Sequence, residues 1–170
     1  MPSNPRDLIA LARERVEQKQ LSETSYRRAV SDAYYAVFMT LTESGSKALL
    51  PPGFPQEAAA RAFEHKVIGK TFQYLMSDNK TKAGIQYKGY FSAETHDILH
   101  KMAITFLRLQ NERYTVDYNH AIDYPADKVS VLLSKADEFI AMAELLEQNH
   151  RTDFQNLAAL LLLRKTSNIL

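Results

Sequence analysis

Apolar residues recur at helical spacing along most of the chain. In the strongest run they occupy positions i, i+3, i+4 and i+7 through four turns, which predicts one buried helix face. The members of this run are Tyr26, Ala29, Val30, Ala33, Tyr34, Val37, Phe38 and Leu41. We expect the helix to end near Gly45, and Pro51, Pro52 and Gly53 then force a connection.

Two more helices are predicted around this central one. Asn4, Pro5 and Asp7 supply an N-cap, a first-turn proline and an acid near the positive helix end, so a first helix should begin there. A third helix is expected from about residue 55 to residue 76. Its two apolar edges contain Phe63, Val67, Ile68, Phe72, Tyr74 and Leu75. The stretch that follows, up to residue 91, should form a long basic surface loop.

The second half of the chain predicts three further helices. Ser92 can cap the fourth, and its periodicity becomes irregular from about Arg113 onwards. Thr152 or Asp153 can cap the sixth, which should run to about Lys165. The fourth helix is expected to bury Ile98, Leu99, Met102, Ala103, Phe106 and Leu107, and the fifth, starting at Pro125, to bury Val129, Leu132, Leu133, Ala136, Ile140 and Ala143.

Composition agrees with a helical fold. The chain has 170 residues, of which 45% are hydrophobic and 24% charged, and this suits one globular domain with a continuous core. It has only five glycines, and neither strand alternation nor an internal repeat stands out. We therefore predict an all-α protein, an antiparallel four-helix bundle with one or two accessory helices. Residues 1–170 should form a single domain, with 150–170 as an accessory or dimerisation helix.

Charge and cysteine content reduce the number of function classes that fit this chain. Cysteine is absent, which excludes disulfides and thiolate catalysis and fits a reducing cytoplasm. Residues 1–7 lack the apolar core of a secretory signal, and no apolar run approaches the roughly 20 residues that span a bilayer, so we expect a cytoplasmic protein without a membrane segment. The formal net charge is +1, whereas a dedicated double-stranded DNA binder usually has a stronger basic bias.

Three segments resemble a known family. Residues 26–38 read Tyr-Arg-Arg-Ala-Val-Ser-Asp-Ala-Tyr-Tyr-Ala-Val-Phe, which is similar to the second helix of bacterial and archaeal HEPN proteins. Residues 5–12 resemble the first helix of that family, and residues 107–118 resemble an arginine-then-Asp-Tyr segment found in one of its branches. The matching pieces keep the family's order between about residues 5 and 146. The chain therefore resembles the HEPN helical domains.

The resemblance implies a candidate active site. Many HEPN proteins are metal-independent endoribonucleases that place an arginine four to six residues before a histidine, in a cleft shared by two protomers. Here Arg113 precedes His120 with six residues between them, and the position of the commoner histidine is Tyr118. Arg113 would hold a phosphate and His120 would transfer a proton, without a cofactor. Asn111, Asp117 and Tyr118 would be supporting neighbours, with Asp117 orienting the arginine.

Ordinary structural roles are open for the same residues. Arg113 and Asp117 can form a surface ion pair worth about 0.3–0.5 kcal/mol if the helix continues. His120 can be a solvated loop histidine, and Tyr34 and Tyr35 can be core and near-core residues, because they lie on or beside the apolar stripe. If the departure from the usual spacing has abolished cleavage, the alternative is a non-catalytic helical interaction module that partners a nucleotidyltransferase. A homodimer, RNA as ligand, and toxin–antitoxin, defence or stress roles follow from the resemblance alone.

Three other features invite a functional interpretation. Positively charged side chains near Tyr87 and Tyr90 could contact nucleic acid, although loop lysines usually serve solubility. His96 and His100 are one helical turn apart but have no obvious third ligand, so we expect no metal site. Residues 157–163 are either a last core helix or an interface, and their apolar excess favours an interface. The loop lysines are Lys80, Lys82 and Lys88.

Overall fold

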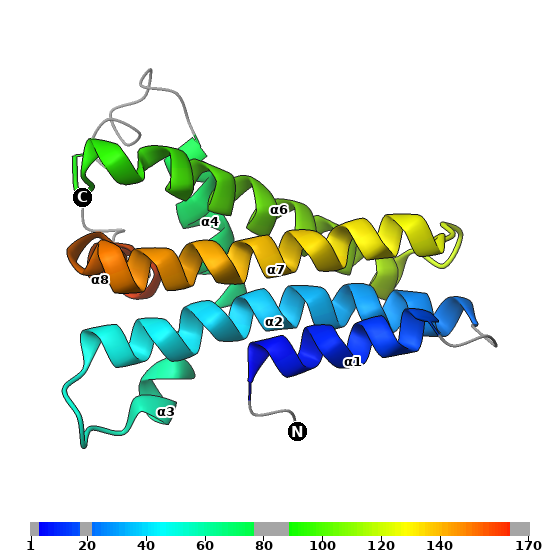
Figure 1. The fold of residues 1–170 in the computed structure, drawn as a ribbon, viewed down its shortest axis with the longest axis horizontal. Helices are drawn as coiled ribbons and strands as arrows, with labels where there is room; N and C mark the ends of the chain where they lie inside the picture. The colour runs from blue at the N-terminus through cyan, green and yellow to red at the C-terminus, as the bar shows by residue number, and fades with distance from the viewer. Residues whose placement is uncertain (1–3, 18–21, 77–88, 164–170) are drawn as a thin grey trace. The chain divides into compact units, whose positions relative to one another are not determined.

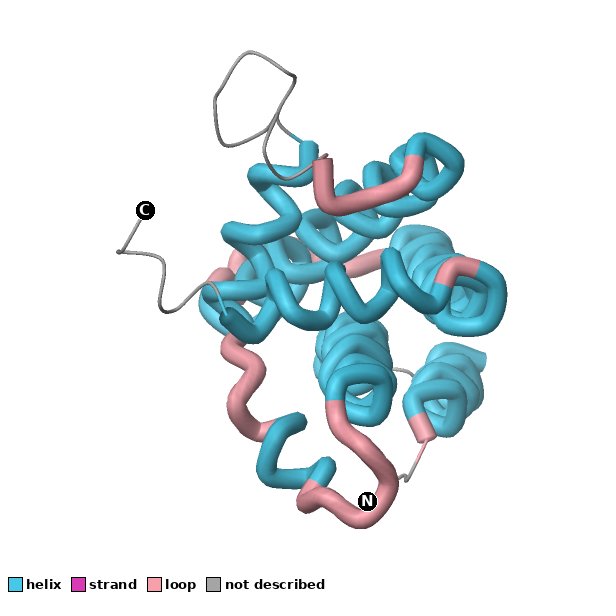
Figure 2. Tube along the Cα trace, turned by 90° about the vertical axis from the view of Figure 1, so that its left-hand side faces the viewer, coloured by secondary structure: helices cyan, strands magenta, loops and turns pink. Residues whose placement is uncertain are grey.

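The computed structural model describes residues 4–17, 22–76 and 89–163 of the chain. Figure 2 shows helices and loops, and no strand, in this described part, which confirms the predicted all-α class. The helices labelled in Figure 1 are α1 (Pro5–Glu17), α2 (Glu23–Leu49), α3 (Gln56–Ala60), α4 (His65–Met76), α6 (His96–Tyr118), α7 (Ala126–Asn149) and α8 (Arg151–Leu163). The short 3-10 helix η1 (Ala93–Thr95) directly precedes α6. None of these helices is long and apolar enough to cross a membrane.

The chain divides into two compact units. Residues 1–39 and 105–141 make up the first unit, and residues 40–104 and 142–170 make up the second. Both units are discontinuous in sequence, because α2, α6 and α7 each contribute residues to both of them.

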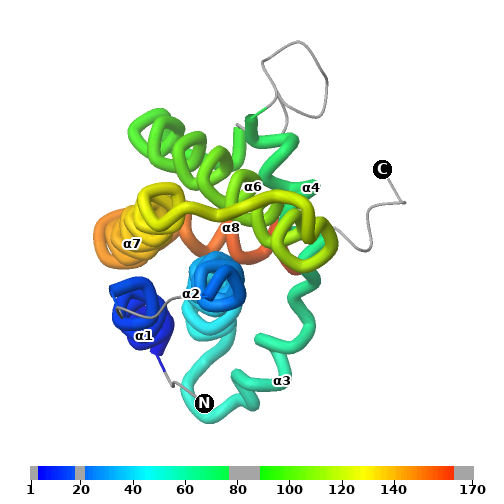
Figure 3. The backbone as a smooth tube through the Cα atoms, turned by 90° about the vertical axis from the view of Figure 1, so that its right-hand side faces the viewer, coloured from blue at the N-terminus to red at the C-terminus, as the bar shows by residue number. Residues whose placement is uncertain are grey.

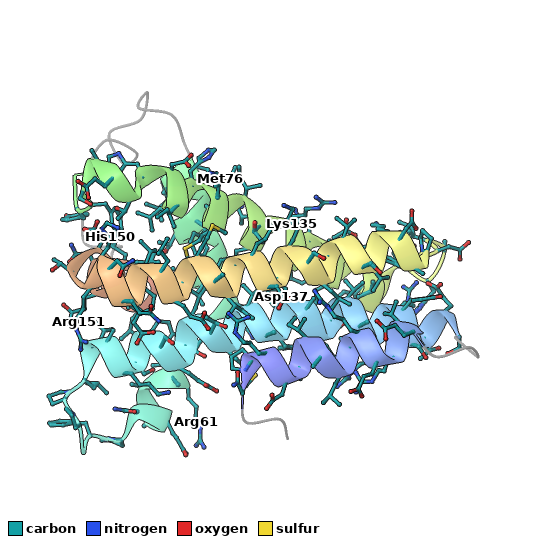
Figure 4. All side chains as sticks on the ribbon, in the orientation of Figure 1. Arg61, Met76, Lys135, Asp137, His150 and Arg151 are labelled. Atoms are coloured by element: carbon teal, nitrogen blue, oxygen red, sulfur yellow. The ribbon has the colours of Figure 1, made fainter. Side chains whose placement is uncertain are left out.

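The first unit is a four-helix bundle. Each of its four helices pairs with two others, so that the contacts run α1 to α2 to α6 to α7 and back to α1. Neighbouring helices run in opposite directions, and Figure 3 views the four of them from the end at which α6 gives way to α7. The joining pairs are Arg15–Asp32, Ser31–Asp117, Glu112–Lys128 and Asp137–Arg13, the last at 2.5 Å with Asp137 labelled in Figure 4. The predicted antiparallel bundle is therefore confirmed.

Aromatic rings fill the centre of the first unit. The ring centroid of Phe106 lies 5.6 Å from that of Tyr34 and 6.4 Å from that of Phe139, and all three residues are buried. Burial raises the pKa of Tyr34 to about 12. The core role expected of Tyr34 is confirmed, whereas its neighbour Tyr35 is 36% exposed. The stripe predicted for α7 is buried throughout, from Val129 onwards.

Helix α2 does not end near Gly45 as its sequence suggested, but continues to Leu49. Gly45 is buried, and a Cβ atom added to it would lie 3.2 Å from Cζ of Phe63 and 3.3 Å from Cβ of Ala158. The hydrogen atom of glycine allows these two side chains to approach the helix backbone. The close packing offsets the roughly 1 kcal/mol that glycine costs inside a helix.

Enlarging the side chain at position 45 should therefore destabilise the protein. We expect Gly45→Ile to lower the free energy of unfolding by about 1–3 kcal/mol, because the added atoms collide with buried groups. Lys47→Ile, at an exposed position of the same helix, is the control and should change stability by less than about 0.5 kcal/mol. Urea unfolding of both variants measures the difference. Equal midpoints would show that position 45 has room for a side chain.

The single helix predicted over residues 55–76 is wrong, because the structure has two helices there. Helix α3 is only five residues long and buries none of them, and a turn over residues 61–64 separates it from α4. Phe63 lies in that turn and is buried near Gly45. The alanines of α3 give it no apolar stripe that would hold it in line with α4. In α4, Ile68, Phe72 and Leu75 are buried as predicted.

In the second unit, neither Ser92 nor Asp153 caps a helix with its side chain as the sequence predicted. Ser92 stands at the N-cap position of η1, but its hydroxyl makes no cap hydrogen bond and instead donates to Asp153 at 2.6 Å. Helix α8 begins at Arg151, so Asp153 lies inside its first turn rather than at its cap. Long-range pairing of these two residues therefore replaces the local capping that their sequence context predicts.

The apolar tail forms part of the second unit's own core. Leu157, Ala158 and Leu161 are buried, while the other described side chains of the tail, at positions 159, 160 and 162, are half-buried. Helix α8 contacts α4, and its Gln155 donates a hydrogen bond to the carbonyl oxygen of Ala48 at 2.9 Å. One face of the tail therefore packs within this chain, as a core helix does, and the interface on its remaining side chains stays a prediction.

Candidate functional site

Arg113, Asp117 and Tyr118, which the family resemblance singles out, lie on the last two turns of α6, in the first unit. The helix continues through the irregular stretch to Tyr118, so Arg113 and Asp117 lie one turn apart on the same face. Nε of Arg113 is 2.7 Å from Oδ2 of Asp117, and the two side chains form the expected ion pair. The Nε–H group does not point at an acceptor as a hydrogen bond requires, so the contact is one between charges.

Two tyrosine rings lie close to the guanidinium group of Arg113. Nη2 donates a hydrogen bond to the hydroxyl of Tyr35 at 3.2 Å, and Cζ lies 5.7 Å from the centroid of that ring. Cζ also lies 5.5 Å from the ring centroid of Tyr114. Burial lowers the pKa of Arg113, but the interactions with Tyr35 and Asp117 more than offset this and raise it above its ordinary value. The group is a fixed cation with aromatic neighbours.

The rings around Arg113 are open to solvent. Tyr35 is 36% exposed, Tyr114 is 47% exposed and Tyr118 is 74% exposed. The Tyr114 and Tyr118 rings stack on each other, with centroids 6.3 Å apart and planes inclined by 26°. We call Arg113 and these three tyrosines the tyrosine surface. Flat exposed rings beside a positive charge can stack on nucleobases or bury against a protein partner.

Asp117 is anchored from a second helix. The hydroxyl of Ser31, a buried residue of α2, donates a hydrogen bond to Oδ1 of Asp117 at 3.2 Å. The other carboxylate oxygen faces Arg113. Asp117 therefore links α2 to the guanidinium group and restricts the directions in which Arg113 can point.

The structure separates the remaining candidates from Arg113. His120 lies in the turn over residues 119–122 after α6, is exposed, and makes no hydrogen bond or ion pair with any described residue. Asn111 is exposed, and its carbonyl oxygen accepts a hydrogen bond from the hydroxyl of Thr115 at 3.0 Å. Of the predicted site residues, Asp117 and Tyr118 are brought to Arg113, while His120 and Asn111 are not in contact with it.

Two further sequence hypotheses concern the loop lysines and a metal site at His96 and His100. Lys80, Lys82 and Lys88 lie outside the described residues. Within the described ranges, no group of three or more histidine, aspartate or glutamate side chains is placed to hold a metal ion. His96 and His100 are one turn apart on α6.

Arg27 is a site residue that sequence reasoning missed. It lies on α2, and its side chain is 12% exposed. Its guanidinium group donates to the carbonyl oxygens of Val116 at 2.8 Å, Asn119 at 2.6 Å and Ile122 at 2.9 Å. Arginine stands at this position in the segment that resembles the HEPN family, but no spacing rule predicts partners about 90 positions away in sequence.

Comparison with known proteins adds no relative to these observations. No family model, no curated protein and no solved structure matches the chain.

Proposed function

We propose that the protein is a HEPN-type RNA-binding protein that holds single-stranded RNA on the tyrosine surface. The observation that carries this proposal is that the Arg113 guanidinium group lies close to the rings of both Tyr35 and Tyr114, while the Tyr118 ring, stacked on that of Tyr114, is exposed. Single-strand binders combine a cation for the phosphate with aromatic rings on which bases stack. The resemblance of residues 26–38 and 107–118 to HEPN proteins points to the same ligand.

Single-stranded RNA suits this surface better than a duplex does. Paired bases are stacked on each other, so the tyrosine rings can reach them only after unpairing. A duplex is held largely by many phosphate contacts, and a chain of formal net charge +1 has little excess positive charge to offer. A few stacked bases and one phosphate on Arg113 need no wide basic groove.

Cleavage is the second part of the proposal and assigns His120 a chemical role. The imidazole would take the proton of an RNA 2′-hydroxyl, and the 2′-oxygen would then bond to the neighbouring phosphorus. The bond from phosphorus to the 5′-oxygen breaks, leaving a cyclic phosphate, and the imidazolium returns a proton to the 5′-oxygen. Arg113 would stabilise the charge that develops on the phosphate. The family's shared cleft would bring a second protomer to the same surface.

Replacing Arg113 tests both parts of the proposal. Arg113→Ala should weaken binding of a short single-stranded RNA at least about tenfold, because it removes the cation and the support of two rings. Tyr118→Ala should cost about 1–3 kcal/mol of binding free energy, as expected for one lost stacked base. Arg28→Ala removes a 68% exposed arginine of the same unit and is the matched control, which should bind normally. Fluorescence anisotropy at fixed salt measures the affinities.

Wild type, the three single variants above and a further single variant, His120→Ala, are then assayed for cleavage of the RNA. Products with cyclic phosphate ends, formed without added metal and lost in both Arg113→Ala and His120→Ala, would support the reaction. Binding without cleavage would limit the function to RNA binding. If folded wild-type protein binds no single-stranded RNA, or if Arg113→Ala binds as well as Arg28→Ala, the RNA proposal fails.

The second candidate function is a non-catalytic interaction module that partners a nucleotidyltransferase. One observation favours the interaction module: the charge of Arg113 is already paired with Asp117, and His120 is not in contact with Arg113. Exposed tyrosine and arginine are also the residues that dominate protein interfaces. A small nucleotidyltransferase encoded beside this gene, and a complex with it that Arg113→Ala weakens, would favour this function over RNA binding.

A further inference from the structure

Two residues of α2 hold the turn that carries His120. Arg27 donates to the carbonyl oxygens of Asn119 and Ile122, which bracket His120 in sequence. Glu23, one helical turn earlier, lies 3.3 Å from Nη1 of Arg27 and accepts a hydrogen bond from the backbone N–H of Tyr124 at 3.3 Å. We call Glu23 and Arg27 the α2 clamp.

The α2 clamp satisfies backbone groups that a helix end leaves without partners. The last four carbonyl groups of a helix have no N–H of their own helix to accept from, and the partial negative charge there attracts a cation. Arg27 meets both needs for α6, because Nε and Nη2 both donate to the carbonyl oxygen of Val116, at 3.1 and 2.8 Å. Its guanidinium group has five N–H donors in a rigid fork, which lysine lacks.

The α2 clamp extends past the helix end, and this goes beyond ordinary capping. A cap needs to reach only the carbonyl groups of the last turn, whereas Arg27 also binds the carbonyl of Ile122, four residues beyond the end of α6. Within the turn, the N–H of Ala121 donates to the side-chain oxygen of Asn119 at 3.1 Å. The backbone on both sides of His120 is therefore fixed, while its imidazole is exposed and has no described partner.

We propose that Arg27 is a positioning residue, which fixes the turn over residues 119–122 and thereby the backbone that carries His120. The functional part of this inference rests on the proposed RNA cleavage. The imidazole is exposed and has no described partner, so the backbone that carries it is what sets the point from which the side chain reaches out. Misplacing a catalytic group by about 1 Å can cost about 100-fold in rate.

Hydrogen exchange tests the structural part without any ligand. In Arg27→Lys and Arg27→Gln, the amides of Ala121 and Tyr124 should exchange at least about tenfold faster than in wild type, while core amides of α7 remain protected. Glu23→Gln should accelerate Tyr124 alone. Arg28→Gln, which changes the neighbouring arginine, is the control and should leave the turn unchanged.

Each outcome of the exchange experiment bears on the inference. Unchanged exchange in the turn for both Arg27 variants would overturn it, and so would equal acceleration in Arg28→Gln. If Arg27→Gln exchanges faster everywhere because it is globally unstable, Arg27→Lys, which keeps the charge, decides. Acceleration confined to the turn in Arg27→Lys supports the α2 clamp.

The functional part is measured as a split between kcat and KM for RNA cleavage. Arg27→Lys should lower kcat about 10- to 100-fold and leave KM within about twofold, because Arg113 and the tyrosines that bind RNA are untouched. An unchanged kcat, or a loss confined to KM, would overturn the positioning role. If the wild type neither binds nor cleaves RNA, the proposed function has failed instead, and the exchange result alone decides whether the α2 clamp holds the turn.

Discussion

Phe106→Ala is expected to lower the free energy of unfolding by about 3–5 kcal/mol. Phe106 is 0% exposed, and its ring contacts those of Tyr34 and Phe139 at the centre of the four-helix bundle. Removing the ring takes away its transfer free energy and leaves a cavity between α2, α6 and α7. These helices are held apart by other buried side chains, so they cannot close the gap fully, and the cavity adds to the loss.

Thermal or urea unfolding of Phe106→Ala gives the loss directly. Tyr118→Ala is the control, because it truncates a 74% exposed aromatic residue of the same helix and should change stability by less than about 0.5 kcal/mol. The double variant Phe106→Ala with Phe139→Ala should cost less than the sum of the two single variants, since they share one contact. Similar costs for Phe106→Ala and Tyr118→Ala would mean that Phe106 is not a central core residue.

Local sequence patterns predicted the parts of the fold that depend on neighbours along the chain. The buried stripe of α7 follows from its period of 3.6 residues, because one face of an isolated amphipathic helix is already defined before it packs. The pair Arg113–Asp117 follows from spacing for the same reason, as residues four apart on a helix are adjacent. Both predictions follow once the segment is known to be helical, because helix geometry alone decides which residues share a face.

The failed predictions of a helix end near Gly45 and of two helix caps concern contacts between distant segments. Glycine and the following prolines suggested a helix end near Gly45, but the approach of Phe63 and Ala158 keeps that position helical. Ser92 and Asp153 each looked like a helix cap, but they bond to each other across 61 residues of sequence. Nothing within one turn of either residue indicates its partner.

The candidate site also combines residues that are close in sequence with residues that are distant in sequence. Arg113, Asp117 and Tyr118 could be predicted together because they share two turns of α6. Tyr35 and Arg27 belong to α2, and they reach the site only because α2 and α6 are antiparallel neighbours in the bundle. The sequence placed Tyr35 on or beside the apolar stripe and suggested core or near-core packing, and its hydroxyl accepts a hydrogen bond from Arg113 while the residue is 36% exposed.

Asp153→Asn is expected to lower the free energy of unfolding by about 2–4 kcal/mol near neutral pH. Asp153 is 7% exposed and receives three donors, the N–H of Ser92 at 3.1 Å, the hydroxyl of Ser92 at 2.6 Å and the hydroxyl of Thr95 at 2.7 Å. An asparagine side chain would place an NH2 group against one of these donors. With the asparagine oxygen in the place of Oδ2, its NH2 group would take the place of Oδ1, 3.3 Å from the N–H of Ser92, and the three remaining hydrogen bonds would end on a neutral oxygen and be weaker.

This loss should depend on pH in a defined direction. Burial raises the pKa of Asp153, but the hydrogen bonds from Ser92 and Thr95 more than offset that effect and hold it below its ordinary value. A carboxylate whose pKa is lower in the folded state stabilises the protein above the unfolded pKa of about 3.9, and this contribution disappears as the pH falls through the folded pKa. The stability difference between wild type and Asp153→Asn should therefore be constant near neutrality and shrink below about pH 4.

Urea unfolding at several pH values, with a matched control, measures this difference. Asp97→Asn changes a 74% exposed carboxylate of the same unit, which pairs with Lys101 at 2.7 Å on the helix surface, and should cost less than about 0.5 kcal/mol at any pH. If Asp153→Asn behaves like Asp97→Asn, the three converging hydrogen bonds do not stabilise the fold. If its cost is large but does not fall in acid, the wild-type effect comes from packing rather than from the carboxylate charge, because only a charged group loses its contribution on protonation.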